Sequence, residues 1–341
     1  MQPIHSRGDG RSDGSWPDRA RGAIGSVARD RWFAQMPYHR VLPARVRSPM
    51  TASPNLESRI PAPRSAAIAF IGGGNMARSL VGGLVVRGVP GNSIRVAEPV
   101  EAARTALVAD FGVAAFGSGA EAVDGAGVWV LAVKPQVLRQ VCEAIAPQAR
   151  AQRPLVISIA AGITSTQIAR WLAGDGDGDA ATPIVRCMPN TPAMLGAGVT
   201  GLFATPQVDA QGRAQAEELL SSAGATVWID EEAKMDAVTA VSGSGPAYVF
   251  LLAEAMEDAA KRQGLSDAAA RTLVLQTVLG AARMLTESDE PPAELRRRVT
   301  SPGGTTEAAV ETFEAGGLRE LVDRAIASAT ARGHALSAAN D

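Results

Sequence analysis

A glycine-rich turn between an apolar run and a helix-like segment offers backbone N–H groups to a phosphate. Residues 72–77 read GGGNMA, which fits the pattern G-x-G-x-x-A, and they follow the apolar run at 66–71. Glycines at these places permit a tight turn and let a pyrophosphate approach the positive end of the following helix. An ordinary structural turn is the alternative. Because the pattern lies inside a strand–helix–strand unit, it predicts a dinucleotide-binding site.

An acidic residue ends the second predicted strand, where the adenosine ribose of a dinucleotide would bind. A carboxylate at Glu98 can accept hydrogen bonds from the ribose hydroxyls and would repel a 2′-phosphate, which favours NAD over NADP. Arg95 and Arg104 are close enough in sequence to offset this repulsion. A solvated carboxylate is the alternative. The choice between NADH and NADPH therefore stays open at this point.

Two further short motifs follow apolar strands. AVKP at 132–135 comes at the end of the run 128–133, and AAG at 160–162 follows the run 155–159. Open parallel sheets bind their ligands at the carboxyl ends of the strands. Lys134 could reach a cofactor phosphate or a carbonyl group, and an exposed lysine without such a role is the alternative.

Two glycine- and hydroxyl-rich segments precede helices near the C-terminus. They are SGSGPAY at 242–248 and TSPGGTT at 300–306. The second segment can expose consecutive backbone N–H groups together with hydroxyl donors, which makes an anion site without a cationic side chain and suits a carboxylate. A capped helix start is the alternative for each segment.

The elements that must position these motifs alternate between strands and helices over the first part of the chain. Strands without hydrophobic alternation, separated by helices, indicate a parallel sheet covered on both faces. We therefore predict an α/β fold with a Rossmann-type, mainly parallel sheet in residues 65–230, followed by an all-helical domain in residues 231–341. Helices of this second domain are apolar on most faces, which indicates helices buried on several sides or a dimerisation domain packed across a subunit interface. The expected strands are 66–71, 93–97, 113–116, 128–133, 155–159, 184–187, 198–203 and 226–229. The expected helices are 76–87, 101–111, 137–146, 165–172, 210–222, 234–241, 246–263, 267–286, 291–299, 307–314 and 318–329.

The composition excludes several classes of function. The 341 residues carry 33 basic and 35 acidic side chains, and this balance argues against a nucleic-acid binder. With only Cys142 and Cys187, a disulfide scaffold and a thiolate zinc cluster are excluded. The three histidines are His5, His39 and His334, so we expect neither a histidine metal site nor a Ser-His-Asp triad in the folded body. No run of eighteen apolar residues occurs, so we expect no membrane span.

The first 64 residues differ from the rest of the chain. They hold eleven Arg, no Lys, five acidic residues and frequent Pro, and no window shows helical or strand periodicity. This composition predicts an extension that is disordered or that arises from too early a start codon. A targeting segment is the alternative, but a secretory signal would need an apolar run that is absent here. The expected location is the cytoplasm.

The ordered set of motifs resembles the pyrroline-5-carboxylate reductases. The segments that carry the resemblance are FIGGGNMA, LAVKPQ, AAGI, RCMPNTP, AVSGSGPAYVF and VTSPGGTT, in this order from about residue 66 to the C-terminus. The resemblance implies reduction of 1-pyrroline-5-carboxylate to L-proline, the last step of proline biosynthesis, by hydride transfer from NADPH or NADH. It also implies a homodimer, with a larger ring of dimers as the further expectation.

The resemblance also assigns roles to individual residues. Ser301, Gly303, Gly304, Thr305 and Thr306 would hold the substrate carboxylate and ring, and Thr306 and Ser301 are the expected catalytic residues. In the family the position of Glu98 is often Ser, Asn or Thr, and Arg298 stands where a small or polar residue is frequent. The residues assigned to the dinucleotide are Ile71, Gly72, Gly73, Gly74, Asn75, Met76, Glu98, Ala132, Val133, Lys134, Pro135, Ala160, Ala161 and Gly162.

Two other functions compete with this interpretation. A β-hydroxyacid-dehydrogenase-like NAD(P) oxidoreductase would resemble its family in a helical Lys followed four residues later by Asn. Here Lys234 is followed by Val238 and Lys261 by Leu265, so this pair is absent. A non-catalytic Rossmann-fold binding protein would not need the segment at 300–306.

Overall fold

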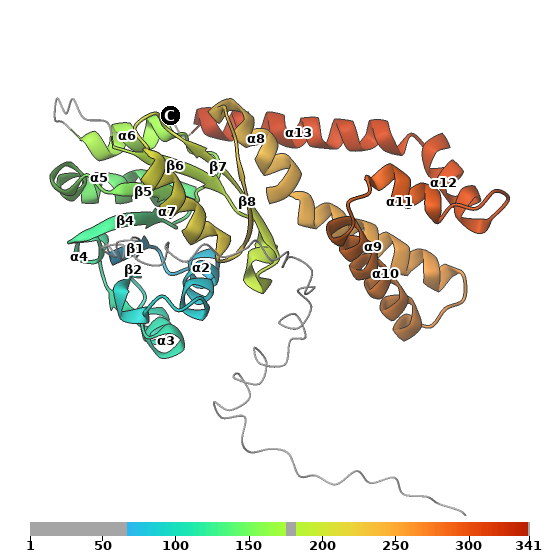
Figure 1. The fold of residues 1–341 in the computed structure, drawn as a ribbon, viewed down its shortest axis with the longest axis horizontal. Helices are drawn as coiled ribbons and strands as arrows, with labels where there is room; N and C mark the ends of the chain where they lie inside the picture. The colour runs from blue at the N-terminus through green and yellow to red at the C-terminus, as the bar shows by residue number, and fades with distance from the viewer. Residues whose placement is uncertain (1–66, 175–181, 340–341) are drawn as a thin grey trace, which may run out of the picture. The chain divides into compact units, whose positions relative to one another are not determined.

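Eight short strands form one sheet in the computed structural model, which describes residues 67–174 and 182–339 (Figure 1). The strand order is β3-β2-β1-β4-β5-β6-β7-β8, and every neighbouring pair is parallel except β6 and β7. The expected extension at 1–64 lies outside the described residues. The strands are β1 (Ala67–Ile71), β2 (Ile94–Ala97), β3 (Ala114–Phe116), β4 (Ala126–Leu131), β5 (Leu155–Ser158), β6 (Ile184–Met188), β7 (Gly198–Ala204) and β8 (Gly224–Trp228).

Helices cover both faces of this sheet (Figure 1). Phe70, Val130 and Ile157 point to one face, where they pack with buried side chains of α2, α3 and α7. Side chains of α4, α5 and α6 cover the opposite face. Burial on both faces explains why the central strands β1, β4 and β5 are almost continuously apolar. The helices are α2 (Asn75–Val86), α3 (Glu101–Phe111), α4 (Gly119–Val123), α5 (Pro135–Gln152), α6 (Ser165–Ala173) and α7 (Ala210–Ser221), with short 3-10 turns η2 (Gly91–Ser93) and η3 (Thr191–Leu195).

After β8 the described chain is helical, which confirms the predicted fold class. A short turn and helix lead into a π-helical segment, η5, and then into five α-helices. The elements are η4 (Glu232–Lys234), α8 (Met235–Val238), η5 (Thr239–Gly243), α9 (Gly245–Arg262), α10 (Asp267–Glu287), α11 (Pro292–Arg298), α12 (Thr305–Ala315) and α13 (Leu318–Ala339).

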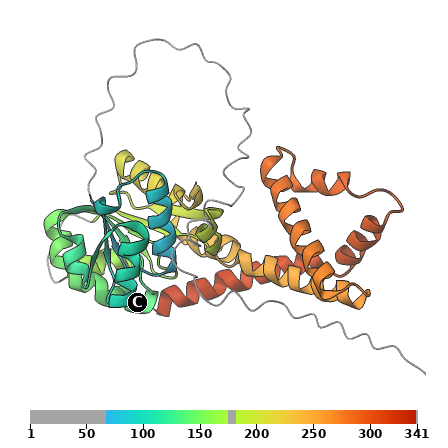
Figure 2. The same ribbon diagram turned by 90° about the horizontal axis from the view of Figure 1, so that it is seen from below.

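The last helix returns to the α/β part of the fold. Both views show the C-terminal end of α13 beside the helices of the sheet (Figures 1 and 2). The amide of Gln167 on α6 donates to the carbonyl oxygen of Ser337 at 3.2 Å. On α13, a Cβ added to Gly333 would lie 3.1 Å from the Cβ of Asp236 on α8. Glycine at position 333 therefore allows α13 and α8 to approach closely.

Two helices extend further than the sequence predicts. We expected one to end at residue 146, before Pro147, but α5 continues to Gln152 with Pro147 inside it. The buried face of Cys142, Ile145 and Ala146 continues to Ala149, so packing on the sheet offsets the hydrogen bond that proline removes. The expected end of the last helix at 329 is also wrong, because α13 continues to Ala339.

Candidate active site

The glycine turn after β1 has the geometry that a dinucleotide loop requires. Gly72 has φ of +108°, and its N–H donates to the carbonyl oxygen of Ala97 at 2.9 Å. A Cβ at this position would lie 2.5 Å from the carbonyl oxygen of Ala132, so only glycine fits between β1 and β4. A Cβ on Gly74 would meet no atom within 4 Å. The turn is therefore packed on its inner side and open at Gly74.

The first turn of α2 is available to an anion. Gly74 is the N-cap residue of this helix, and no side chain caps it. The N–H groups at the start of a helix have no intrahelical acceptor and lie at its positive end. Residues 75 and 76 therefore present N–H groups at the place where the sequence predicts a pyrophosphate.

The Glu98 carboxylate is fixed beside this glycine turn. Its Oε2 accepts a hydrogen bond from Gly73 N–H at 3.2 Å, and its Oε1 accepts one from Val100 N–H at 3.0 Å. A Cβ on Gly73 would lie 2.7 Å from Cδ1 of Leu107 and 3.1 Å from Oε2 of Glu98. The structure therefore brings Glu98 and the glycine turn together at the carboxyl ends of β1 and β2.

The other predicted cofactor residues lie along the same edge of the sheet. Ala132 donates to Ile71 O at 2.8 Å, and Val133 and Pro135 are half-buried beside it. Lys134 is exposed, and its ammonium group makes no hydrogen bond or ion pair with the described residues. After β5, Ala160 is buried and Ala161 is half-buried, whereas Gly162 is buried and lies against Leu336 of α13.

The predicted substrate segment lies between α11 and α12. Ser301, Gly303 and Thr305 are exposed, and Gly304 and Thr306 are half-buried. Gly304 is the N-cap residue of α12 and no side chain caps this helix, so its first N–H groups are available to an anion.

Two details of this substrate segment bear on ligand binding. Gly303 N–H donates to Oε2 of Glu307 at 2.6 Å, so one donor of the segment is already bound to a carboxylate of the chain. Arg298 does not approach the segment as a ligand group, because its Nη1 contacts both oxygens of Glu290 at 2.8 Å.

The structure keeps the two parts of the predicted site separate within one chain. The main packing contacts of α11 and α12 are with α10 and α13, respectively. The glycine turn, by contrast, packs among β1, β2 and β4. Within one protomer, the predicted dinucleotide site therefore lies on the sheet, whereas the predicted substrate segment lies among the C-terminal helices.

Three side chains that could donate a proton, those of Tyr248, Lys234 and Lys261, are engaged elsewhere. The hydroxyl of Tyr248 donates to Ala240 O at 3.0 Å. Glu231 and Asp230 surround the ammonium of Lys234 and raise its pKa, which keeps this lysine protonated. Lys261 lies 3.7 Å from Asp258 Oδ1 and 3.9 Å from Asp267 Oδ1. These contacts give none of the three a role at the substrate segment.

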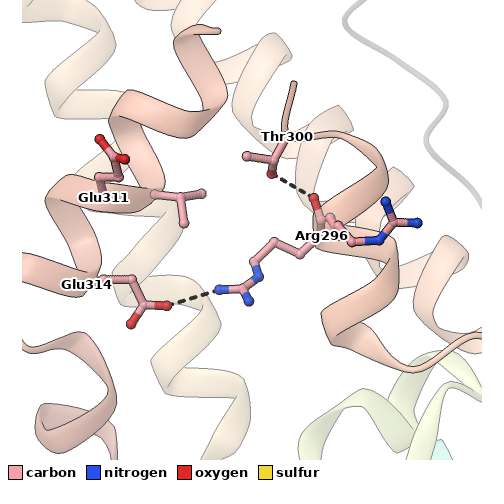
Figure 3. Close-up of a pocket in the computed structure, with 6 residues that line it drawn as sticks. Arg296, Thr300, Glu311 and Glu314 are labelled. Carbon is pink, nitrogen blue, oxygen red and sulfur yellow. Dashed lines mark hydrogen bonds and ion pairs between the residues drawn. The ribbon is translucent and has the colours of Figure 1, made fainter. Parts of the chain in front are cut away.

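A surface hollow of about 400 Å³ lies between α11 and α12. In Figure 3 the side chain of Arg296 crosses it toward Glu314, and Thr300 turns back to the Arg296 carbonyl. These contacts measure 3.0 Å and 2.7 Å. None of the predicted substrate residues lines the hollow, which makes it a feature of helix packing beside the predicted site.

A network of ion pairs and hydrogen bonds that the sequence does not predict, centred on a buried arginine, joins the sheet to the C-terminal helices. Arg186 on β6 is only 4% exposed, and its guanidinium lies 3.2 Å from Glu232 Oε1 and 3.5 Å from Asp236 Oδ1. Ser165 N–H and Oγ donate to the Glu232 carboxylate at 2.6 and 2.5 Å. His334 Nδ1 lies 2.8 Å from Asp236 Oδ2. We call these five residues the Arg186 network.

The remaining predictions concern cysteine, metal and membrane. Burial raises the pKa of Cys142 to about 12, with a smaller contribution from Glu143, and burial alone raises that of Cys187. Both thiols are therefore protonated and unreactive at neutral pH. In the ranges 67–174 and 182–339, no group of three or more His, Cys, Asp and Glu side chains is placed to hold a metal ion. Within the same ranges, no helix is both long and apolar enough to cross a membrane.

Comparison with known proteins gives two family matches. Residues 232–336 match the family model described as pyrroline-5-carboxylate reductase dimerisation, and residues 67–162 match NADP oxidoreductase coenzyme F420-dependent. A pyrroline-5-carboxylate reductase of Pseudomonas aeruginosa is 51% identical over 265 residues, which cover 78% of this chain and 94% of the relative.

Solved structures with the same arrangement include two enzymes of this kind. A pyrroline-5-carboxylate reductase from Coxiella burnetii is 42% identical, with a TM-score of 0.76, over 80% of this chain and 99% of the relative. A pyrroline carboxylate reductase from Plasmodium falciparum, solved with NADP bound, is 28% identical, with a TM-score of 0.68, over 80% and 98% of the two chains.

Proposed function

The chain belongs to the pyrroline-5-carboxylate reductase family, and from this premise we propose that it reduces 1-pyrroline-5-carboxylate to L-proline with NADH or NADPH. The observation that carries the proposal is a pair of helix N-termini that no side chain caps. One is the start of α2, which follows the glycine turn, and the other is the start of α12, which lies within the segment at 301–306. The first fits a pyrophosphate and the second fits the carboxylate of a small substrate. The two competing functions are not favoured, because the curated relatives that match most of the chain are reductases of this kind.

The proposed mechanism depends on placement of the substrate. A cyclic imine that is protonated on nitrogen is already electrophilic at its carbon, so the reaction needs no strong acid from the protein. The chemistry that a bound NADH or NADPH supplies is a hydride, which forms the new C–H bond while the C=N π electrons become the nitrogen lone pair. The N–H groups and hydroxyls of Ser301, Thr305 and Thr306 hold the carboxylate and ring in line for this transfer. The sheet edge from Ile71 to Gly162 holds the dinucleotide.

We further propose that one site combines residues from two protomers. The substrate segment packs among the C-terminal helices and is exposed at Ser301, Gly303 and Thr305. A homodimer formed through residues 231–341 would bring this segment to the dinucleotide edge of the partner subunit. The family match over 232–336 supports both the dimer and a domain boundary near residue 230. A ring of several dimers and a cytoplasmic location belong to the same proposal.

An assay of the full-length protein tests the function directly. We expect NADH or NADPH to be oxidised only after 1-pyrroline-5-carboxylate is added, with proline formed in equal amount. Measurement of absorbance at the nicotinamide band together with chromatography of proline checks this. Dinucleotide binding without oxidation would favour the non-catalytic alternative. No oxidation with 1-pyrroline-5-carboxylate, but oxidation of the dinucleotide when a β-oxo acid is added instead, with the β-hydroxyacid as product, would favour the dehydrogenase alternative.

Replacing Thr306 with Ala is expected to lower kcat/KM by about 30- to 150-fold, which corresponds to about 2–3 kcal/mol. The loss arises because the hydroxyl that positions the substrate ring is removed while the helix start is kept. The matched control is Thr312→Ala, since the hydroxyl of Thr312 on the same helix donates only to Ala308 O at 2.9 Å. Steady-state kinetics of both variants check the prediction, and equal kcat/KM values would remove Thr306 from the site.

A further inference from the structure

The Glu98 carboxylate is held rigidly at the place where a dinucleotide ribose would lie. Each of its oxygens accepts one backbone N–H, from Gly73 at 3.2 Å and from Val100 at 3.0 Å. In Rossmann-type folds the adenosine ribose binds at the end of the second strand beside the glycine turn. From this geometry we infer that Glu98 makes the site selective for NADH over NADPH, an inference that rests on the proposed function.

The space beside the glycine turn is already filled on the Glu98 side. A Cβ on Gly73 would lie 2.7 Å from Leu107 Cδ1 and 3.2 Å from Glu98 Cβ. The Glu98 side chain is half-buried and cannot swing outward without giving up both of its N–H contacts. A ribose 2′-hydroxyl can donate to such a carboxylate, whereas a 2′-phosphate with a charge of about −2 would lie against it.

The nearby arginines do not neutralise this carboxylate. Arg104 directs Nη1 to the carbonyl oxygens of Glu98 and Pro99, both at 2.8 Å. Arg95 directs Nη2 to Glu121 O at 2.6 Å and stacks over the Phe116 ring at 4.6 Å. Among the described residues, no lysine or arginine forms an ion pair with the Glu98 carboxylate. Neither arginine therefore offsets the charge of the Glu98 carboxylate by direct contact.

The selectivity is a property of this position and not of the fold. The Plasmodium falciparum relative was solved with NADP bound, and its chain has the same arrangement with a TM-score of 0.68. The fold as such therefore accommodates the 2′-phosphate. A single carboxylate at the end of β2 is sufficient to change the preference, because like charges in contact disfavour each other strongly.

Equilibrium binding of NADH and NADPH to the full-length protein tests this inference independently of turnover. By isothermal titration calorimetry, we expect NADPH to bind at least tenfold more weakly than NADH. In Glu98→Gln, which keeps the side-chain shape, and in Glu98→Ser, we expect this ratio to fall to threefold or less, mainly through tighter NADPH binding. The matched control is Glu101→Gln, which removes an exposed charge three residues away and should keep the wild-type ratio.

The outcomes separate this inference from the proposed function. Equal affinities for the two dinucleotides in the wild-type protein, or an unchanged ratio in both Glu98 variants, would overturn the inference while leaving the reductase intact. A reduced ratio in Glu101→Gln that equals the reduction in Glu98→Gln would assign the effect to net charge and also overturn it. Failure of the wild-type protein to bind either dinucleotide would overturn the proposed function and this inference together.

Discussion

Replacing Leu251 with Glu is expected to prevent the protein from forming its dimer at micromolar concentration. Leu251 lies on α9, and five consecutive residues of this helix, at 248–252, are large, apolar and exposed in a single chain. Since successive helical residues point about 100° apart, these five cover the whole circumference of the helix. A helix that is apolar all round is normally buried. The partner subunit is the surface that would cover it.

Leu251→Glu is expected to weaken the free energy of dimer formation strongly, because the substituted residue occurs in both protomers. Removal of one central contact at an interface costs about 2 kcal/mol or more, and a symmetric dimer carries two copies of each residue. The carboxylate must also be desolvated. We therefore expect dimer dissociation to become easier by a factor of at least about 1000. Sedimentation velocity over a range of concentrations measures this.

The control for Leu251→Glu is Val86→Glu. Val86 is 73% exposed, compared with 65% for Leu251, but it lies at the end of α2 on the α/β part of the chain. The variant Val86→Glu should therefore leave the dimer intact. Because the proposed site combines two protomers, Leu251→Glu should also lose reductase activity, whereas Val86→Glu should retain it. A dimer of unchanged affinity in Leu251→Glu would contradict the assignment of α9 to the interface.

The parts of the fold that local sequence determines were predictable. Continuous apolar runs marked the central strands β1, β4 and β5, because burial on both faces requires apolar side chains at nearly every position. The turn at Gly72 was predictable because a positive φ next to a neighbouring strand leaves room for glycine only. The predicted strand 128–133 was displaced by two residues from β4, since the apolar run that predicts it begins after Gly127 and continues beyond Leu131, the last residue of the strand.

Features that depend on distant segments were not predictable. Gly333 lies beyond the predicted helix end at 329, and its missing side chain allows Asp236 to contact α13. His334 could not be assigned a partner, since Asp236 is almost a hundred residues away in sequence. The substrate segment was predicted from its motif, whereas its separation from the dinucleotide edge follows from the packing of α11 and α12.

Replacing Arg186 with Met is expected to lower the free energy of unfolding by about 3–5 kcal/mol. The guanidinium is the positive centre of the Arg186 network and contacts two carboxylates, of which Asp236 is 8% exposed and Glu232 is 22% exposed in the side chain. Without Arg186 these two like charges remain close together and partly desolvated. Removal of one member of a buried ion pair is costly for this reason, even where the complete pair contributes little.

The matched control for Arg186→Met is Arg139→Met. Arg139 also forms an ion pair, with Glu143 at 2.9 Å, but the two side chains are 63% and 50% exposed. Exposed pairs of this kind contribute less than about 1 kcal/mol, so this variant should unfold at nearly the wild-type denaturant concentration. Both measurements require the same protomer concentration, because dimer formation contributes to the apparent stability.

A triple variant separates the charge imbalance from the loss of packing at the Arg186 network. In Arg186→Met combined with Glu232→Gln and Asp236→Asn, no uncompensated carboxylate remains, and we expect most of the lost stability to return. If Arg186→Met alone lowered the free energy of unfolding by less than about 1 kcal/mol, water or His334 would be compensating the charges of Glu232 and Asp236. If the triple variant were as unstable as Arg186→Met, the loss would come from packing of the Arg186 side chain between β6 and α8. In the expected case, the Arg186 network helps to hold α8 and the end of α13 against the sheet through charge.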